Sequence, residues 1–210
     1  MYFELAAFIT AAILWRSLGK DGLRLFIPFL FIVVVSEFAG RYLNKELRQS
    51  NNWIFSIEVP IEYLFYTWLF RMHFKRPANR SIALFFLVGF SIYTLVIYII
   101  HGIYIFNSDF LLIGSFFMMV FCLLFLFEQY EQPSPQKLLL SAMFWISSGL
   151  FIFNAGEFSY NVLGKFFIVD QMDPAMRLFR KINGRLILVL YSCFIIAFIC
   201  QSIIYRSRKE

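Results

Sequence analysis

Seven apolar segments follow one another along the chain, and each is long enough, or nearly so, to cross a lipid bilayer as a helix. They span residues 2–18, 23–43, 53–72, 82–101, 110–130, 138–163 and 178–205. A transmembrane helix needs about 20 predominantly apolar residues. The pattern therefore predicts an all-α, polytopic integral membrane bundle of about seven transmembrane helices, which forms a single transmembrane domain over residues 1–210.

The first of these segments is the shortest, and it contains Glu4 and Arg16. We expect it to be a retained signal-anchor, because an acid stands where a cleaved signal peptide would carry basic residues. An interfacial first helix, which would leave six spanning helices, is the alternative.

Composition supports a membrane location. Apolar residues make up 60% of the chain and charged residues only 15%, well below the roughly 25% of soluble domains. The net charge of +6 comes from basic residues that stand mostly at the ends of apolar runs, where snorkelling to the lipid headgroups explains them. Membrane lipid is therefore the expected partner, and nucleic acid is excluded.

Several enzyme classes lack their sequence signatures. The three cysteines lie within apolar runs without metal-ligand spacing, and the two histidines form no zinc-binding motif. No nucleophile elbow, phosphate-binding loop or dinucleotide fingerprint occurs. The sequence therefore predicts no cofactor, no metal and no assigned catalytic residue.

The distribution of basic residues predicts the orientation. The connections after the first, third and fifth segments, counted with the segment ends beside them and with the C-terminal tail, contain 11 Lys and Arg, whereas the other side, counted in the same way, contains 8. Cytoplasmic connections carry an excess of these residues. We therefore expect a multi-pass protein of the plasma (inner) membrane, with its N-terminus outside and its C-terminus inside.

Ionisable and amide side chains gather in one half of the predicted bundle, toward the outer side. Charged side chains within spanning segments are costly and commonly mark functional sites. Several recur at intervals of three or four residues and so form one polar stripe on each helix. The predicted ligand-binding residues are Glu37, Arg41, Glu58, Glu62, Tyr66, Asn154, Glu157, Asn161, Asn183 and Arg185.

The charges of these acids must be balanced. Either Arg41 and Arg185 neutralise some of them, or at least one glutamate stays protonated near neutral pH. Pro60 lies between two of the acids and frees the backbone carbonyl of Ser56 from its helical bond. Structural pairs that hold the helices in register, such as Glu37 with Arg41, are the alternative to a ligand site.

Two stretches, "VPIEYLFY" at 59–66 and "KINGRLILVLYSCFIIAF" at 181–198, carry a resemblance. With them the chain resembles small seven-helix membrane modules of bacterial sensory systems, and bacterial seven-helix proteins with a similar third helix. The resemblance implies an outward-facing sensing pocket. The chain departs from the sensor pattern because it lacks a fused kinase or cyclase.

Three function classes follow. The first is a receptor or sensor that binds a small ligand, ion or lipid headgroup and signals through a separate partner chain. The second is a transporter or a pore-forming effector, whose pore could lie between copies of a homo-oligomer. The third is an intramembrane lipid enzyme that would use Glu58, Glu62 or Glu157 as acid and base. The chain is similar in length to the lysoplasmalogenases but lacks their paired aspartates.

Overall fold

The structure is a computed structural model that describes residues 2–19, 22–131, 138–169 and 177–207, without the side chains of 164–169 and 177–180. The described residues form an all-helical protein with seven α-helices. These are α1 (Tyr2–Ile13), α2 (Phe26–Lys45), α3 (Asn52–His73), α4 (Pro77–His101), α5 (Asp109–Tyr130), α6 (Ala142–Val169) and α7 (Arg177–Ser207), with a short 3-10 helix, η1 (Leu23–Leu25), before α2. The predicted helices are confirmed, although several boundaries differ.

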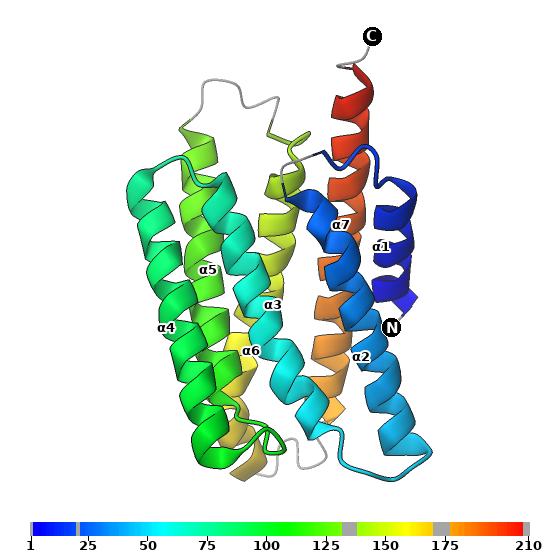
Figure 1. Cartoon of the computed structure of the whole chain (residues 1–210), viewed down its shortest axis with the longest axis vertical. Coiled ribbons are helices and arrows are strands. Elements are labelled where there is room, and N and C mark those ends of the chain that lie inside the picture. The colour runs from blue at the N-terminus through cyan, green and yellow to red at the C-terminus, as the bar shows by residue number, and fades with distance from the viewer. Residues whose placement is uncertain (1, 20–21, 132–137, 170–176, 208–210) are drawn as a thin grey trace.

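Helices α2 to α7 run alternately up and down in one bundle (Figure 1). Helices α3, α5 and α7 end at the same end of the bundle, which is called here the C-terminal end, and α2, α4 and α6 end at the opposite end. The short turns between neighbouring helices produce this antiparallel order. Helix α1 packs beside α2 and α7, and α3 lies against both α4 and α5.

Helix α1 is much shorter than the predicted segment 2–18. It has 12 residues and ends at Ile13, so it rises about 18 Å, against the roughly 30 Å of a bilayer core. Residues 14–18 form turns in place of a helix, and Ser17 donates its hydroxyl to the Leu14 carbonyl at 2.7 Å. Figure 1 shows the described start of α1 about halfway along the bundle.

Within the part of the chain that the structure describes, four helical segments are long and apolar enough to cross a membrane, namely Leu23–Lys45, Pro77–His101, Asp109–Tyr130 and Lys181–Ser207. They indicate a multi-pass membrane protein. Helix α4 shows the pattern most clearly, because large apolar side chains such as Phe85 and Ile99 are 79% and 74% exposed. In water such a face would be unfavourable, whereas lipid chains would cover it.

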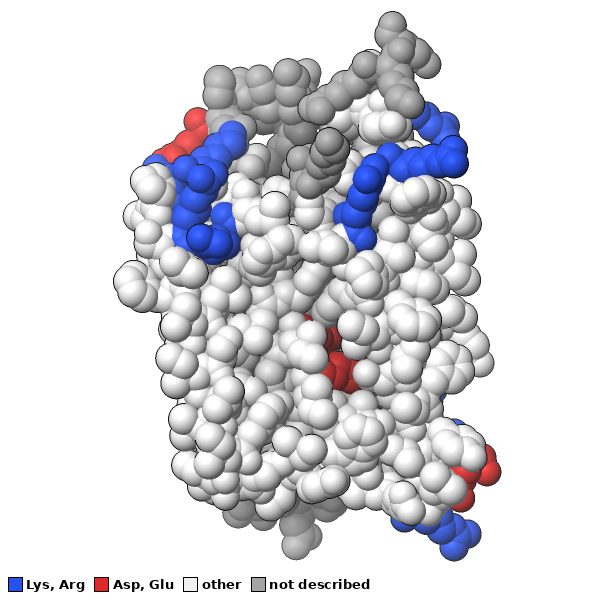
Figure 2. All heavy atoms as spheres, viewed as in Figure 1, with Lys and Arg blue, Asp and Glu red and all other residues white. Residues whose placement is uncertain are grey.

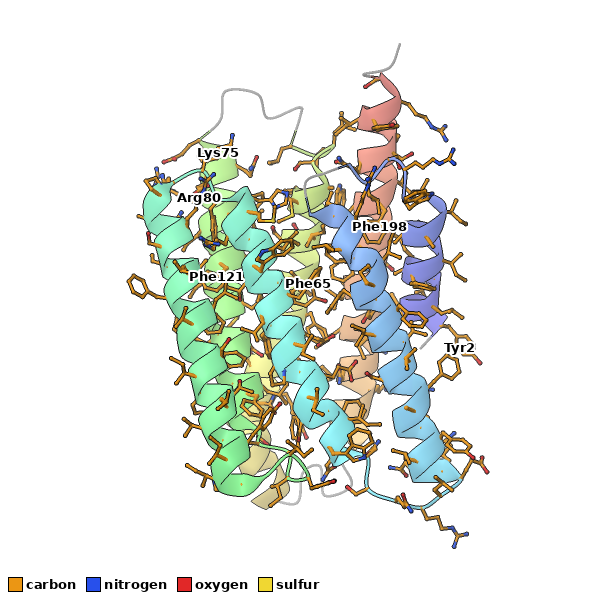
Figure 3. The ribbon with its side chains drawn as sticks, viewed as in Figure 1. Tyr2, Phe65, Lys75, Arg80, Phe121 and Phe198 are labelled. Carbon is orange, nitrogen blue, oxygen red and sulfur yellow. The ribbon has the colours of Figure 1, made fainter. Side chains whose placement is uncertain are left out.

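Aromatic rings fill the half of the bundle toward the C-terminal end. Phe26 lies with its ring centroid 5.1 Å from that of Phe65, 5.3 Å from Phe194 and 5.5 Å from Phe198. Phe29 stacks on Phe65 at 4.1 Å. We call these five rings the aromatic seal; Figure 3 labels two of them, Phe65 and Phe198. The rings join α2, α3 and α7.

A buried carboxylate holds the turn between α3 and α4. Glu128 of α5 accepts hydrogen bonds from the backbone N–H groups of Lys75 (2.7 Å) and Arg76 (3.2 Å) and from the side-chain amide of Asn79 (2.6 Å). It therefore satisfies backbone donors where α4 begins and is favoured by the helix dipole. Figure 3 shows Lys75 at the C-terminal end of the bundle.

Candidate functional site

A cavity of about 130 Å³ lies among α1, α2, α3, α6 and α7. Its volume is several times what one water molecule requires. The polar part of its lining consists of four carboxyl groups (Glu4, Glu37, Glu58, Glu62), two amides (Asn154, Asn183) and three tyrosines (Tyr63, Tyr66, Tyr191). We call it the acidic cavity.

Helices α2 and α3 touch on both sides of the acidic cavity. Toward the C-terminal end, Phe29 of α2 stacks on Phe65 of α3. Toward the opposite end, Asn51 donates its side-chain amide to the Gly40 carbonyl at 3.2 Å, and a Cβ on Gly40 would lie 3.3 Å from the Phe55 ring.

The acidic cavity residues of α2 and α3 lie between those two contacts. In chain order Glu37 falls between Phe29 and Gly40, and both Glu58 and Glu62 fall between Phe55 and Phe65. Figure 2 shows acidic atoms recessed between α2 and α3, about halfway along the bundle. The cavity is therefore visible from the side of the bundle.

Pro60 acts as the sequence predicts. It lies inside α3 and cannot donate to the Ser56 carbonyl. That carbonyl instead accepts a hydrogen bond from the Tyr98 hydroxyl of α4 at 2.5 Å. The freed oxygen therefore links α3 to α4.

Tyr63 forms a fixed wall of the cavity. Its hydroxyl forms a buried 2.9 Å hydrogen bond with the hydroxyl of Ser115 on α5. A Cβ on the neighbouring Gly114 would lie only 2.3 Å from the Tyr63 ring, a distance that no ordinary packing allows. Glycine at 114 thus permits α3 and α5 to approach closely enough for this bond.

Unpartnered acceptor oxygens face the cavity. Glu58 is 7% exposed, and its Oε2 atom has no hydrogen-bond partner among the described residues. Asn154 is 2% exposed; its Nδ2 donates to the Leu150 carbonyl at 2.7 Å, while its Oδ1 has no such partner. The Oδ1 atom of Asn183 is in the same situation. Leaving buried acceptors unsatisfied costs about 1–3 kcal/mol each.

The charge of the cavity differs from the sequence-based expectation. No Lys, Arg or His occurs among the residues that the structure places in its lining. Arg41 does bond to Glu37, with 3.2 Å between Nε and Oε2, so that predicted pair is confirmed. Its side chain is 50% exposed, however, and Arg185 is exposed as well. Neither arginine therefore lines the cavity, although Arg41 pairs with one of its acids.

Six of the ten predicted site residues line the cavity, namely Glu37, Glu58, Glu62, Tyr66, Asn154 and Asn183. Glu157 is buried outside that lining, with Asn161 donating to its Oε2 at 3.3 Å and to its backbone carbonyl at 2.8 Å. Local pairing along α6 thus explains the spacing of these two residues.

Three polar cavity residues escaped the sequence analysis, namely Glu4, Tyr63 and Tyr191. Glu4 was noted only as an acid near the start of the first segment, although it is 2% exposed in the structure. Tyr63 and Tyr191 are aromatic residues within apolar runs. Helical spacing would have found Tyr191, because it lies eight residues after Asn183 on the same helical face.

The acidic cavity does not resemble a metal site. Among the described residues, no group of three or more His, Cys, Asp or Glu side chains lies close enough together to hold a metal ion. The carboxyl groups therefore line a space instead of converging on one point.

Comparison with known proteins adds no family. A scan against protein-family models finds no match, and neither a search of curated proteins nor a search of solved structures finds one. The function must therefore be inferred from the acidic cavity itself.

Proposed function

We propose that this chain is a receptor-type membrane protein that binds a small ligand in the acidic cavity and signals through a separate protein chain. The observation that carries the proposal is the pair of unpartnered oxygens on Glu58 and Asn154, both more than nine-tenths buried. Folding gains nothing from leaving these acceptors unsatisfied. A ligand that donates hydrogen bonds would offset that cost.

The aromatic seal favours binding over passage through a single chain. Beyond the cavity, toward the C-terminal end, Phe26, Phe194 and Phe198 are fully buried in contact with one another or with Phe65. A transport path would need polar groups or water in this half. The polar lining instead ends at Tyr66, whose ring lies 5.2 Å from that of Phe29.

The proposed orientation has the N-terminus outside and the C-terminus inside the plasma (inner) membrane. Figure 2 shows basic side chains gathered at the C-terminal end of the bundle, on both sides of this view. Basic residues favour the cytoplasmic side. A reporter fused after Glu210 should therefore be cytoplasmic and one within residues 103–109 external; reversed labelling would overturn the orientation.

The binding function is tested by filling the cavity. The substitution Asn154→Phe places a ring where the unpartnered amide lies and should exclude a ligand. Native mass spectrometry of the gently purified parent should show a bound small molecule that is missing from the variant. Ser148→Phe, a half-buried position on the same helix outside the cavity lining, is the control and should keep it.

Liposomes separate binding from transport. The reconstituted parent should carry no ion current and accumulate no solute, because the aromatic seal leaves no polar path through one chain. A current in the parent that Asn154→Phe abolishes would instead favour the pore, and the receptor proposal would be rejected.

A further inference from the structure

We infer that the ligand of the acidic cavity carries an ammonium group on an apolar chain and that it reaches the cavity sideways from the lipid, between α2 and α3. This inference rests on the proposed binding function and adds the chemical class of the ligand and its route.

The polar lining selects a hydrogen-bond donor with positive charge. Carboxylate oxygens accept hydrogen bonds, and the unpartnered atoms of Asn154 and Asn183 are amide oxygens, which also accept. One of the two side-chain N–H groups of Asn154 is already used in the bond to the Leu150 carbonyl at 2.7 Å. An ammonium group offers three donors and one positive charge, which complements this lining. An anion would meet acceptors and like charge.

The aromatic lining favours an organic cation over a metal ion. The rings of Tyr63, Tyr66 and Tyr191 line the same cavity as the carboxyl groups. Aromatic faces attract ammonium groups, and such rings combined with acids form cages for organic cations. The described carboxyl groups are also too dispersed to hold a metal ion.

The route follows from the contacts between α2 and α3. The two helices are held together by the Phe29–Phe65 stack on one side and by Asn51 at Gly40 on the other, and the acidic atoms are visible between them (Figure 2). Their outer surfaces are apolar here, since Val35 and Ile61 are 47% and 40% exposed. A ligand with an apolar chain could therefore keep that chain in lipid while its charged group occupies the cavity.

The test uses the full chain in lipid nanodiscs and follows thermal unfolding with hexylammonium, hexanol and hexanoate. The three probes have the same six-carbon chain but a positive, a neutral and a negative head group. They therefore separate the effect of charge from the effect of the apolar chain. Hexylammonium should raise the melting temperature saturably, whereas hexanol and hexanoate should not. An equal response to hexanol, or a stronger one to hexanoate, would overturn the ammonium assignment but leave a binding cavity in place.

Substitutions test whether hexylammonium binds in the acidic cavity. Glu58→Gln replaces one carboxyl oxygen by an NH₂ group and removes the acid, and Asn154→Leu removes the unpartnered amide oxygen. Both changes nearly preserve volume, so each should weaken the binding of hexylammonium by about tenfold or more, as expected for a lost charge-assisted contact. Glu131→Gln makes the same acid-to-amide change at an exposed carboxyl that pairs with Arg76, and it should leave the response unchanged. Unaltered binding in both cavity variants would overturn the site.

Methylammonium tests the route. It carries the same charge but has no apolar chain, so lipid does not concentrate it beside α2 and α3. It should need a concentration at least about tenfold higher than hexylammonium for the same shift, since each methylene adds a few-fold to partitioning into lipid. Equal potency of the two amines would overturn access from lipid and indicate a water-soluble amine.

Discussion

Glu128 and Glu58 are both buried glutamates in the helices of this bundle, 4% and 7% exposed, yet their surroundings are opposite. Glu128 accepts three hydrogen bonds, two of them from the backbone where α4 begins. Glu58 has an oxygen without a partner among the described residues and faces three other acids across a cavity. The first arrangement stabilises the fold, whereas the second leaves a cost that the proposed ligand would relieve.

The difference shows that burial alone does not mark a functional acid. A carboxylate surrounded by donors is satisfied at the moment of folding. One surrounded by acceptors is not, and its presence needs another explanation. Substitutions should therefore affect the two regions in different ways.

The largest effect is expected from Glu128→Ala. This change leaves three donors without their acceptor, namely the part-buried backbone N–H groups of Lys75 and Arg76 and the buried amide of Asn79, and an orphaned buried donor costs about 1–3 kcal/mol. The free energy of unfolding in mixed micelles should fall by about 3–5 kcal/mol. Glu131→Ala, which breaks only the half-exposed pair with Arg76, should cost about 1 kcal/mol or less. Equal losses would contradict the structural role of Glu128.

The next effect is expected at the wall of the cavity. Gly114→Ala places a methyl group 2.3 Å from the Tyr63 ring, so α3 and α5 must separate. Overpacking of this kind costs about 1–3 kcal/mol. Gly89→Ala is the matched control on α4, since its Cβ would meet nothing within 4 Å, and it should be neutral or slightly stabilising. Thermal unfolding of both variants measures this difference. Equal melting temperatures would show that Tyr63 and Gly114 are not tightly packed.

A smaller effect is expected from Tyr98→Phe. The variant keeps the ring and removes the hydroxyl that donates to the Ser56 carbonyl. We expect a loss of about 0.5–1.5 kcal/mol in the free energy of unfolding, the usual net value of one hydrogen bond. Tyr104→Phe, on a side chain that is 73% exposed, should change nothing measurable. If the two variants behave alike, the Tyr98 bond contributes nothing to stability.

The smallest effect on stability is expected from Glu58→Gln. Because Glu58 Oε2 has no hydrogen-bond partner within the described ranges, stability should change by less than about 0.5 kcal/mol or should increase. Ligand binding should nevertheless fall, as described above. A loss comparable to that of Glu128→Ala would show that Glu58 is also a structural acid, and the comparison between the two regions would fail.

The helices could be predicted because apolar length is a local property of the sequence. Six of the seven segments match α2 to α7 closely, since each run extends between polar or proline-containing turns. The first segment was predicted too long. Its residues 14–18 contain Arg16 and Ser17 but also three large apolar side chains and no glycine or proline, so composition alone could not reveal that the helix ends at Ile13.

The cavity could be predicted in part. Glu58, Glu62 and Tyr66 repeat at helical spacing, which identified their face of α3. The sequence did not show that Arg41 and Arg185 are exposed, because the direction of a long side chain depends on neighbouring helices. The sequence likewise could not show that the Tyr98 hydroxyl donates to the Ser56 carbonyl, because the two residues are 42 positions apart in the chain.

That contact has a mechanical consequence. A helix bends most easily where proline removes a backbone hydrogen bond, and in α3 this point lies beside Glu58. The hydrogen bond from the Tyr98 hydroxyl to the free Ser56 carbonyl links α3 to α4 at this point. Bending α3 at Pro60 therefore requires that one bond to open, at a cost of about 1 kcal/mol. A force on Glu58 that bends α3 would therefore be opposed by the hydrogen bond of one tyrosine, Tyr98, on the neighbouring helix.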